Sequence, residues 1–242
     1  MNAEKMPEMA RGETEANITV KNIEQSAAQS KKGSSTHANI IYLAVKRLAD
    51  IILSALALIL LSPLMLVLAL MVKLEDGGPV IHHRACVKKG GGTFIMYKFR
   101  SMKTDADKLE NYMTPEQIAQ YKKEIKLDND PRITKCGKKL RKYSLDELPQ
   151  LLNILKGDMS IVGPRPIIPE ETFHYGDKID DMLSAKPGLT GYWQVHGRST
   201  STYERGERQR LELYYAYHRN LWLDIKIFFM TFFVVITGKG AM

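Results

Sequence analysis

One uninterrupted apolar segment limits what this chain can fold into. The 22 residues between Asp50 and Lys73 include no charged side chain. As a straight helix with a rise of about 1.5 Å per residue, the segment would extend about 33 Å, enough to cross a bilayer core of roughly 30 Å. The sequence therefore predicts a helix that enters a membrane, or an unusually long helix in a protein core.

Ser62 and Pro63 lie at the centre of this segment. Proline lacks a backbone N–H and clashes with the preceding turn, so we expect the helix to bend or break there. Basic residues flank the segment on both sides, beginning with Lys46 and Arg47. A re-entrant helix can keep both basic ends at one membrane surface. We therefore expect a re-entrant helix hairpin over residues 39–74, with a kinked transmembrane helix or a buried core helix as alternatives.

Residues 1–38 are predicted to be a disordered polar tail. They contain no aromatic residue and are rich in Glu, Lys, Ala, Ser and Asn, so they can bury little apolar surface. An early apolar stretch is missing, which argues against a secretory signal. Residues 75–242 would then form one folded domain after the membrane hairpin.

The net charge favours anionic partners. Lys and Arg number 35 against 27 Asp and Glu, giving a formal charge of +8. Membrane surfaces, nucleotides, phosphates and nucleic acids all suit such a chain. The two cysteines, Cys86 and Cys136, are too few for a disulfide framework and fit a reducing compartment.

The pattern after the apolar segment predicts an α+β fold that is mainly helical. Short apolar runs alternate with glycines up to residue 102, which is typical of a small β-hairpin, here with its tip at Lys88–Gly92. Lys98 and Arg100 would be neighbours on one face of the second strand.

Two further helices are expected. Residues 105–127 have the pattern of a polar amphipathic helix, and Thr114 with Gln117 would form a capping box at a helix start. The uncharged run Ile227–Thr237 is too short to span a membrane. It predicts an aromatic-rich helix in the membrane interface, or one that packs in the core.

The sequence SLDEL, residues 144–148, places two carboxylates side by side. Ser144 and Glu147 match a capping box, and Asp146 would favour the positive end of a helix, so both acids have a structural explanation. Pro149 complicates it, because with Ser144 as the cap the proline would remove a helical hydrogen bond. The alternative is that the two acids form a reactive pair.

Cations surround these carboxylates in the sequence. A basic stretch that includes Arg141 precedes them, and Arg165 follows in a Gly/Pro-rich loop. Cations keep a carboxylate ionised and can receive a phosphate that it would otherwise repel. Mg²⁺ would serve the same end by bridging pyrophosphate oxygens and the carboxylates of Asp146 and Glu147. Zinc-type Cys/His spacing, a Walker loop and a nucleophile elbow are all missing.

Residues 186–199, KPGLTGYWQVHGRS, contain three glycines, a proline and a Tyr-Trp pair. They predict a structured turn that packs its aromatic rings. They could equally offer backbone amides, Gln194 and Arg198 to a nucleotide or sugar.

Several motifs in order resemble one family. They are VKRLAD, the apolar run with its central SP, YKFRSM, NDPRIT, SLDELPQLLNILKGDMSIVGPRP, KPGLTGYWQVHGR and LWLDIKI. This series resembles the bacterial sugar transferases, monotopic polyprenyl-phosphate phosphoglycosyltransferases that begin the assembly of exopolysaccharide, capsule, O-antigen or glycoprotein glycans. The resemblance covers roughly residues 40–242.

The resemblance implies transfer of sugar 1-phosphate from a UDP-sugar to undecaprenyl phosphate, with release of UMP. Asp146 would attack the sugar-linked phosphate and form a covalent sugar-phosphoryl-aspartate in the presence of Mg²⁺, while Glu147 would help to position the metal or the acceptor. The expected phosphate ligands are Arg141 and Arg165, with Lys98 and Arg100 as secondary ones.

The resemblance also implies a location at the cytoplasmic face of the bacterial inner membrane. The partners would be the membrane, the UDP-sugar and undecaprenyl phosphate but no nucleic acid, and a homodimer is compatible with it. The helix would be re-entrant and broken at its Ser-Pro pair, with the first basic residues at the headgroups. The residues expected at the membrane are Lys46, Arg47, Asp50, Ser62 and Pro63.

Some positions depart from the family pattern. Cys86-Val87-Lys88 stands where many relatives have Arg-Val-Gly, and Glu212, a further substrate-binding candidate, stands where relatives often carry Asp. The region Tyr203–Arg205 and the ending GKGAM look more like transferases of hexose phosphate, which favours UDP-galactose or UDP-glucose. The rival functions are a basic membrane adaptor for anionic lipid or nucleic acid, and a nucleotide-sugar hydrolase.

The re-entrant path can be tested by labelling. A cysteine introduced near residue 20 should be shielded from a membrane-impermeant thiol reagent in intact cells, because a helix that returns to the cytoplasmic surface leaves the tail inside. Labelling from outside would instead indicate a spanning helix.

Overall fold

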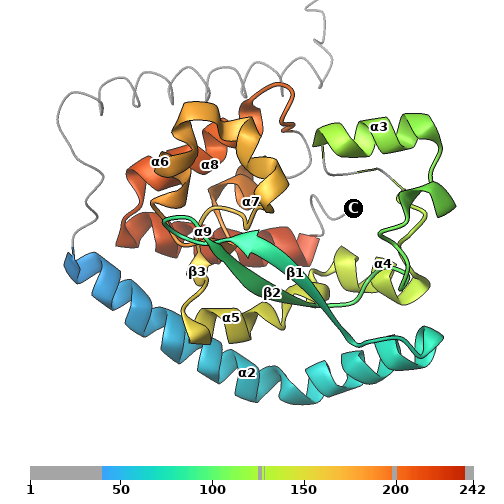
Figure 1. Cartoon of the computed structure of the whole chain (residues 1–242). Helices are drawn as coiled ribbons and strands as arrows, with labels where there is room; N and C mark the ends of the chain where they lie inside the picture. The colour runs from blue at the N-terminus through green and yellow to red at the C-terminus, as the bar shows by residue number, and fades with distance from the viewer. Residues whose placement is uncertain (1–39, 125–126, 128, 198–200, 238–242) are drawn as a thin grey trace, which may run out of the picture. The chain divides into compact units, whose positions relative to one another are not determined.

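The computed structural model describes residues 40–124, 127, 129–197 and 201–237 of the chain. The predicted tail, 1–38, lies outside the described residues. The remainder from residue 38 onward forms one compact unit. Figure 1 shows a long bowed helix, α2, with the β1–β2 hairpin and α5 along its concave side. The mainly helical α+β architecture with a small hairpin is as predicted.

Helix α2, Ile40–Asp76, runs through Pro63 as one element of 37 residues. The helix therefore bends without a break: it is continuous at Pro63 and curved along its length (Figure 1), in agreement with the first of the two predicted outcomes. In a regular helix the amide of residue 63 would donate to the carbonyl of Ile59, which proline cannot do. The Ser62 hydroxyl donates to that same carbonyl at 2.8 Å, so it replaces the missing donor. The re-entrant path remains a prediction.

The predicted hairpin is confirmed. Strands β1, Ile81–Val87, and β2, Thr93–Phe99, pair antiparallel, with Val87 opposite Thr93 at the end next to the tip. The tip contains three successive glycines, Gly90 to Gly92, with φ of 76°, 89° and 70°. Glycine adopts these left-handed conformations without a steric cost, which explains this composition.

The predicted capping box is also confirmed. The Thr114 amide donates to Gln117 Oε1 at 3.0 Å, and the Gln117 amide donates to Thr114 Oγ1 at 3.4 Å. The helix that it begins, α3, is shorter than the predicted 105–127.

Short elements make up most of the rest of the fold. The further elements are η1 Leu109–Asn111, α3 Pro115–Glu124, α4 Lys135–Lys142, η2 Leu145–Glu147, α5 Gln150–Lys156, β3 Ser160–Val162, η3 Pro169–Lys178, α6 Ile179–Leu183, β4 Gly188–Thr190, α7 Tyr192–His196, α8 Glu207–His218 and α9 Leu221–Thr237. Strands β3 and β4 pair in parallel.

Arg47 connects α2 to the C-terminal end of α5. Its guanidinium donates to the carbonyls of Ile154 at 2.6 Å and Leu155 at 2.8 Å. The last carbonyls of a helix have no partner within the helix and carry partial negative charge, so a cation satisfies them well.

Two further polar contacts hold the first half of α2. The buried Asp50 carboxylate accepts from Ser160 Oγ at 3.1 Å and from the Ile161 amide at 2.9 Å. Lys46 forms an ion pair with Asp224 of α9 at 2.7 Å. These charged side chains thus form contacts within the protein, and their predicted position at the membrane surface remains a prediction.

The outer face of α2 is apolar and exposed. In the described part of the chain, α2 is the one helix long and apolar enough to cross a membrane, and 11% of its most apolar window is buried. Its exposed side chains include Leu60 at 76% and Leu66 at 72%. Helix α9 also exposes large apolar side chains, such as Trp222 at 75%. An apolar surface of this extent is typical of a membrane contact.

The Arg47 contacts can be tested by substitution. Arg47→Met keeps the apolar stem and removes both hydrogen bonds, each worth roughly 1.5–3 kcal/mol when the donor is charged. We expect the thermal unfolding midpoint in detergent to fall by about 6 °C or more, measured by differential scanning fluorimetry. Leu48→Met, on the exposed face one residue later, is the control. Equal unfolding midpoints for the two variants would show that the Arg47 hydrogen bonds do not stabilise the fold.

Candidate functional site

The carboxylates of SLDEL lie on the 3₁₀ turn η2, between α4 and α5. Asp146 is 7% exposed and Glu147 is half-buried. Ser144, just before the turn, has a left-handed backbone with φ of 54°, whereas an N-cap has an extended one. The capping-box explanation is therefore wrong. Pro149 immediately precedes α5, where the absence of an N–H costs no helical hydrogen bond.

The apolar residues of η2 attach the two acids to α2. Leu145 and Leu148, on either side of the acidic pair, pack against a buried cluster that includes Leu68 and Val72 of α2. Leu140 of α4 is 1% exposed in the same cluster. The position of the acidic pair therefore depends on the long apolar helix.

Lys98 reaches the pair from β2. Its ammonium lies 2.9 Å from Glu147 Oε1, and the two side chains are 22% and 23% exposed. The structure thus places Lys98 beside Glu147, and its predicted role as a phosphate ligand remains a prediction. Partial exposure keeps the strength of this ion pair modest.

Arg100 behaves differently from the prediction. All five of its N–H donors are bound: Nε donates to the Pro79 carbonyl at 2.7 Å, and the terminal nitrogens bind the Asp76 carboxylate and the carbonyls of Met102 and Val72. The residue is 5% exposed. Its contacts give it a structural role at the end of α2, not that of a phosphate ligand.

Arg141, at the end of α4, is close enough to Asp146 for the two charges to interact. Its Nε donates to Ser101 Oγ at 2.9 Å, which holds the guanidinium in place. Burial lowers the pKa of Arg141, and the charges of Asp146 and Asp130 raise it in part. Arg165 is also close enough to act on the pKa of Arg141. The structure therefore brings Arg141 within electrostatic reach of Asp146, and Arg165 within electrostatic reach of Arg141.

The sequence reasoning missed two residues that shape this region. Asp130 and Arg132 form a buried ion pair, with Arg132 donating from Nε at 2.9 Å and from a terminal nitrogen at 2.6 Å. Asn129, in the same turn, has φ of 54°. The motif NDPRIT, which contains both residues, gave no indication that the Asp130 carboxylate would pair with Arg132 two residues later.

Arg165 and Gln194 each carry a buried polar atom that lacks a partner within the described part of the chain. The Arg165 guanidinium carbon lies 5.6 Å from the centre of the Trp193 ring. Arg165 Nε and Gln194 Oε1 have no hydrogen-bond partner among the described residues. Buried groups of this kind are usually satisfied, so a ligand is a plausible partner. Arg198 lies outside the described residues.

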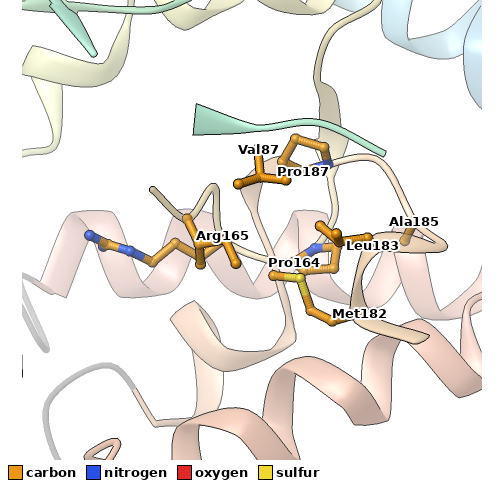
Figure 2. A pocket seen from close by; sticks show the side chains of 8 residues that line it. Val87, Pro164, Arg165, Met182, Leu183, Ala185 and Pro187 are labelled. Atoms are coloured by element: carbon orange, nitrogen blue, oxygen red, sulfur yellow. The ribbon is translucent and has the colours of Figure 1, made fainter. Parts of the chain in front are cut away.

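Arg165 also borders a small apolar cavity. Figure 2 shows its side chain extending away from Val87, Met182 and Pro187, so only its stem lines the space. The cavity holds about 10 Å³, which is the room of roughly one water molecule. It is too small to be the substrate site.

Glu212 lies in a closed ionic network and not at the acidic pair. It is 1% exposed, accepts from the Tyr175 hydroxyl at 2.5 Å, and faces Arg208 Nε at 3.4 Å. Arg208 also pairs with Glu171 at 3.4 Å and lies over the Trp193 ring at 4.6 Å. The predicted direct contact of Glu212 with substrate is therefore not supported by its position.

The carboxylates of Asp146 and Glu147 would suit Mg²⁺ better than they would suit a metal ion whose ligands all come from the protein. Among the described residues, no three His, Cys, Asp or Glu side chains gather as a metal site. Mg²⁺ usually takes one or two carboxylates and completes its coordination with waters and substrate phosphates. Two adjacent carboxylates on one turn fit this donor set.

The burial of Glu212 predicts a dependence of stability on pH. Burial raises its pKa, although Arg208 acts in the opposite direction. A raised folded-state pKa means that the folded protein binds this proton more tightly than the unfolded chain. Its contribution to stability is therefore present at low pH and is lost as pH rises from about 4.5 through the folded pKa. Relative to Glu212→Gln, the wild-type unfolding midpoint should fall as pH rises from 5 to 8. If the unfolding midpoints of the wild type and Glu212→Gln change in parallel across this range, the raised pKa of Glu212 would be contradicted.

Comparison with known proteins identifies the family. The model of the bacterial sugar transferase family matches residues 41–238. The chain is 46% identical over 200 residues to the undecaprenyl-phosphate galactose phosphotransferase of Salmonella typhimurium, covering 81% of this chain and 41% of that protein. It is 40% identical over 203 residues to the UDP-glucose:undecaprenyl-phosphate glucose-1-phosphate transferase of Escherichia coli, covering 81% and 41%. The exopolysaccharide production protein ExoY of Sinorhizobium fredii is 40% identical over 199 residues, covering 81% and 87%. The chain thus spans about two fifths of the length of the first two relatives, and it belongs to the bacterial sugar transferase family.

Proposed function

We propose that this protein transfers sugar 1-phosphate from a UDP-sugar to undecaprenyl phosphate. The names of its relatives support this reaction and a place in exopolysaccharide or capsule synthesis. The observation that carries the proposal is the position of Asp146. This carboxylate is buried on a turn that packs on α2, and it is close enough to Arg141 to affect the pKa of the arginine.

Two displacements at phosphorus account for the products. An oxygen of Asp146 attacks the phosphorus that carries the sugar, and the bond to the bridging oxygen breaks with the electron pair leaving on UMP. The enzyme then holds a sugar-phosphoryl-aspartate. An oxygen of undecaprenyl phosphate attacks the same phosphorus, the bond to Asp146 breaks, and the carboxylate is regenerated with undecaprenyl-diphosphate sugar as the product.

Cations allow an anionic nucleophile to approach an anionic phosphate. Arg141 and Arg165 are the proposed ligands of the pyrophosphate, because planar guanidinium groups bind phosphate oxygens in pairs. Arg141 is held by Ser101, so its position requires little reorganisation during the reaction. Lys98 adds positive charge through its contact with Glu147.

Asp146 and Glu147 would hold Mg²⁺. The ion pair with Lys98 would orient the Glu147 carboxylate. When bound, the ion would neutralise charge on the pyrophosphate and favour the departure of UMP. Gln194 and the unpaired Arg165 Nε are proposed to contact the nucleotide or sugar part of the donor.

We also propose that α2 enters the inner membrane from the cytoplasmic side by a re-entrant path. Its exposed apolar face and the exposed aromatic residues of α9 support membrane association. The cluster that joins Leu145 and Leu148 to α2 would keep the acidic pair close to the bilayer, where the acceptor lipid arrives by lateral diffusion. The proposed sugar is galactose or glucose, as in the names of two relatives.

Release of UMP tests the function. Membranes that contain the protein, given UDP-galactose or UDP-glucose and undecaprenyl phosphate, should form UMP and a sugar-labelled lipid. Asp146→Asn should lower UMP formation by roughly a thousandfold or more, since it removes the nucleophile. Asp177→Asn, an exposed carboxyl on η3, is the matched control and should retain activity.

Other outcomes separate the rival functions. Full turnover by Asp146→Asn would refute the assignment of Asp146 as the nucleophile. UMP and sugar phosphate released without lipid would indicate a hydrolase. Salt-sensitive binding of many polyanions, with no UMP formed from any UDP-sugar, would indicate an adaptor.

A further inference from the structure

A groove lies between the C-terminal end of α2 and the basic helix α4. It is lined by Met71, Leu74 and Glu75 of α2 and by Lys135, Cys136 and Lys139 of α4. Its volume of about 350 Å³ is within the usual range of ligand sites. The residues proposed above to contact the UDP-sugar lie elsewhere, so the groove has no role in that proposal.

The α2 side of the groove is apolar. Met71 is 40% exposed and Leu74 is 74% exposed. They continue the exposed face of α2, on which Leu70 is 57% and Leu66 is 72% exposed. The Glu75 carboxylate accepts from the Cys136 amide at 2.8 Å, so one of its oxygens is directed at the first turn of α4.

The α4 side of the groove is cationic. Lys135 and Lys139 are exposed and one helical turn apart, so their side chains leave the same face of the helix about 5–6 Å apart at Cβ. Neither forms a salt bridge within the described ranges of the chain. Lys138 is exposed on the same helix but does not line the groove.

We propose that this groove is the docking site of the lipid phosphate acceptor, an inference that rests on the proposed function. The lysines bind the phosphate, and the apolar face of α2 receives the first part of the hydrocarbon chain. A phosphate monoester carries a charge of about −1.5 to −2 at pH 7, which matches two lysines. A phospholipid diester carries a single phosphate charge and matches them less well.

The packing of α4 connects the docking site to the acidic pair. Cys136 lines the groove and belongs to the same buried cluster as Leu140. Leu145 and Leu148, which flank the two acids, pack against that cluster. A lipid docked at Lys135 and Lys139 therefore lies against the layer of side chains that supports Asp146. The groove is a docking position, and the lipid phosphate leaves the two lysines before it attacks the phosphorus on Asp146.

Kinetics in nanodiscs of neutral lipid test the site. The double variant Lys135→Gln/Lys139→Gln should raise the KM for undecaprenyl phosphate by roughly tenfold or more, because each lost charged hydrogen bond is worth about a factor of ten. The KM for the UDP-sugar and the kcat at saturating acceptor should stay unchanged. Lys138→Gln is the matched control and should leave the KM for the acceptor within about twofold, since any general effect of surface charge is of that order. Retention of undecaprenyl phosphate by the purified proteins, measured by native mass spectrometry, should fall in the double variant alone.

The possible failures are distinguishable. An unchanged KM for the acceptor in an active double variant would overturn the docking site and leave the proposed function intact. If phosphatidylglycerol at an equal mole fraction displaces undecaprenyl phosphate from the wild type, the groove is a general site for anionic lipids and the proposal is wrong. If the wild type forms no UMP with any UDP-sugar, the proposed function fails, while retention that depends on Lys135 and Lys139 would still support the site.

Discussion

The polar contacts of the first half of α2 are the constraint on which the described fold depends. A helix that leaves most of its apolar side chains exposed gains little from hydrophobic burial on that face. Arg47, Asp50 and Lys46 supply directional contacts instead, to α5, to the start of β3 and to α9. Because a buried charge is costly unless it is paired, each contact also excludes other placements of the helix. The result is a long apolar helix held in one orientation by its few polar residues.

The chemistry of the site follows from this attachment. The turn that carries Asp146 and Glu147 is too short to be stable by itself, and it is fixed by the leucines on either side of the acids. Arg141 of α4 is within electrostatic reach of Asp146, and Arg165, from a later loop, is within electrostatic reach of Arg141, so these charges are assembled only in the folded protein. Arg208, which pairs with Glu171 and Glu212, shares the Trp193 ring with Arg165.

Features set by neighbouring residues were predictable from the sequence. The glycine tip of the hairpin and the Thr114–Gln117 capping box involve residues a few positions apart, and both are observed. Features that depend on partners far apart in the sequence were not predictable from it. Arg100 was predicted to be a phosphate ligand, but it pairs with Asp76, 24 residues earlier. Glu212 was predicted to bind substrate, but it accepts a hydrogen bond from Tyr175, 37 residues earlier. The chain offered many cations and acids, and sequence distance gave no basis for pairing them.

The sequence by itself determined that the chain has one long apolar helix, a β-hairpin, and two adjacent carboxylates in a basic region. These depend on hydrophobic patterning and on local backbone chemistry, which act over a few residues. Only the tertiary structure decided which charged side chains are turned inward. Lys46 meets Asp224 178 residues later, and Asp50 meets Ser160 110 residues later. A charge is satisfied by whichever partner the fold brings within hydrogen-bond distance, and that choice is made by the packing of the whole chain.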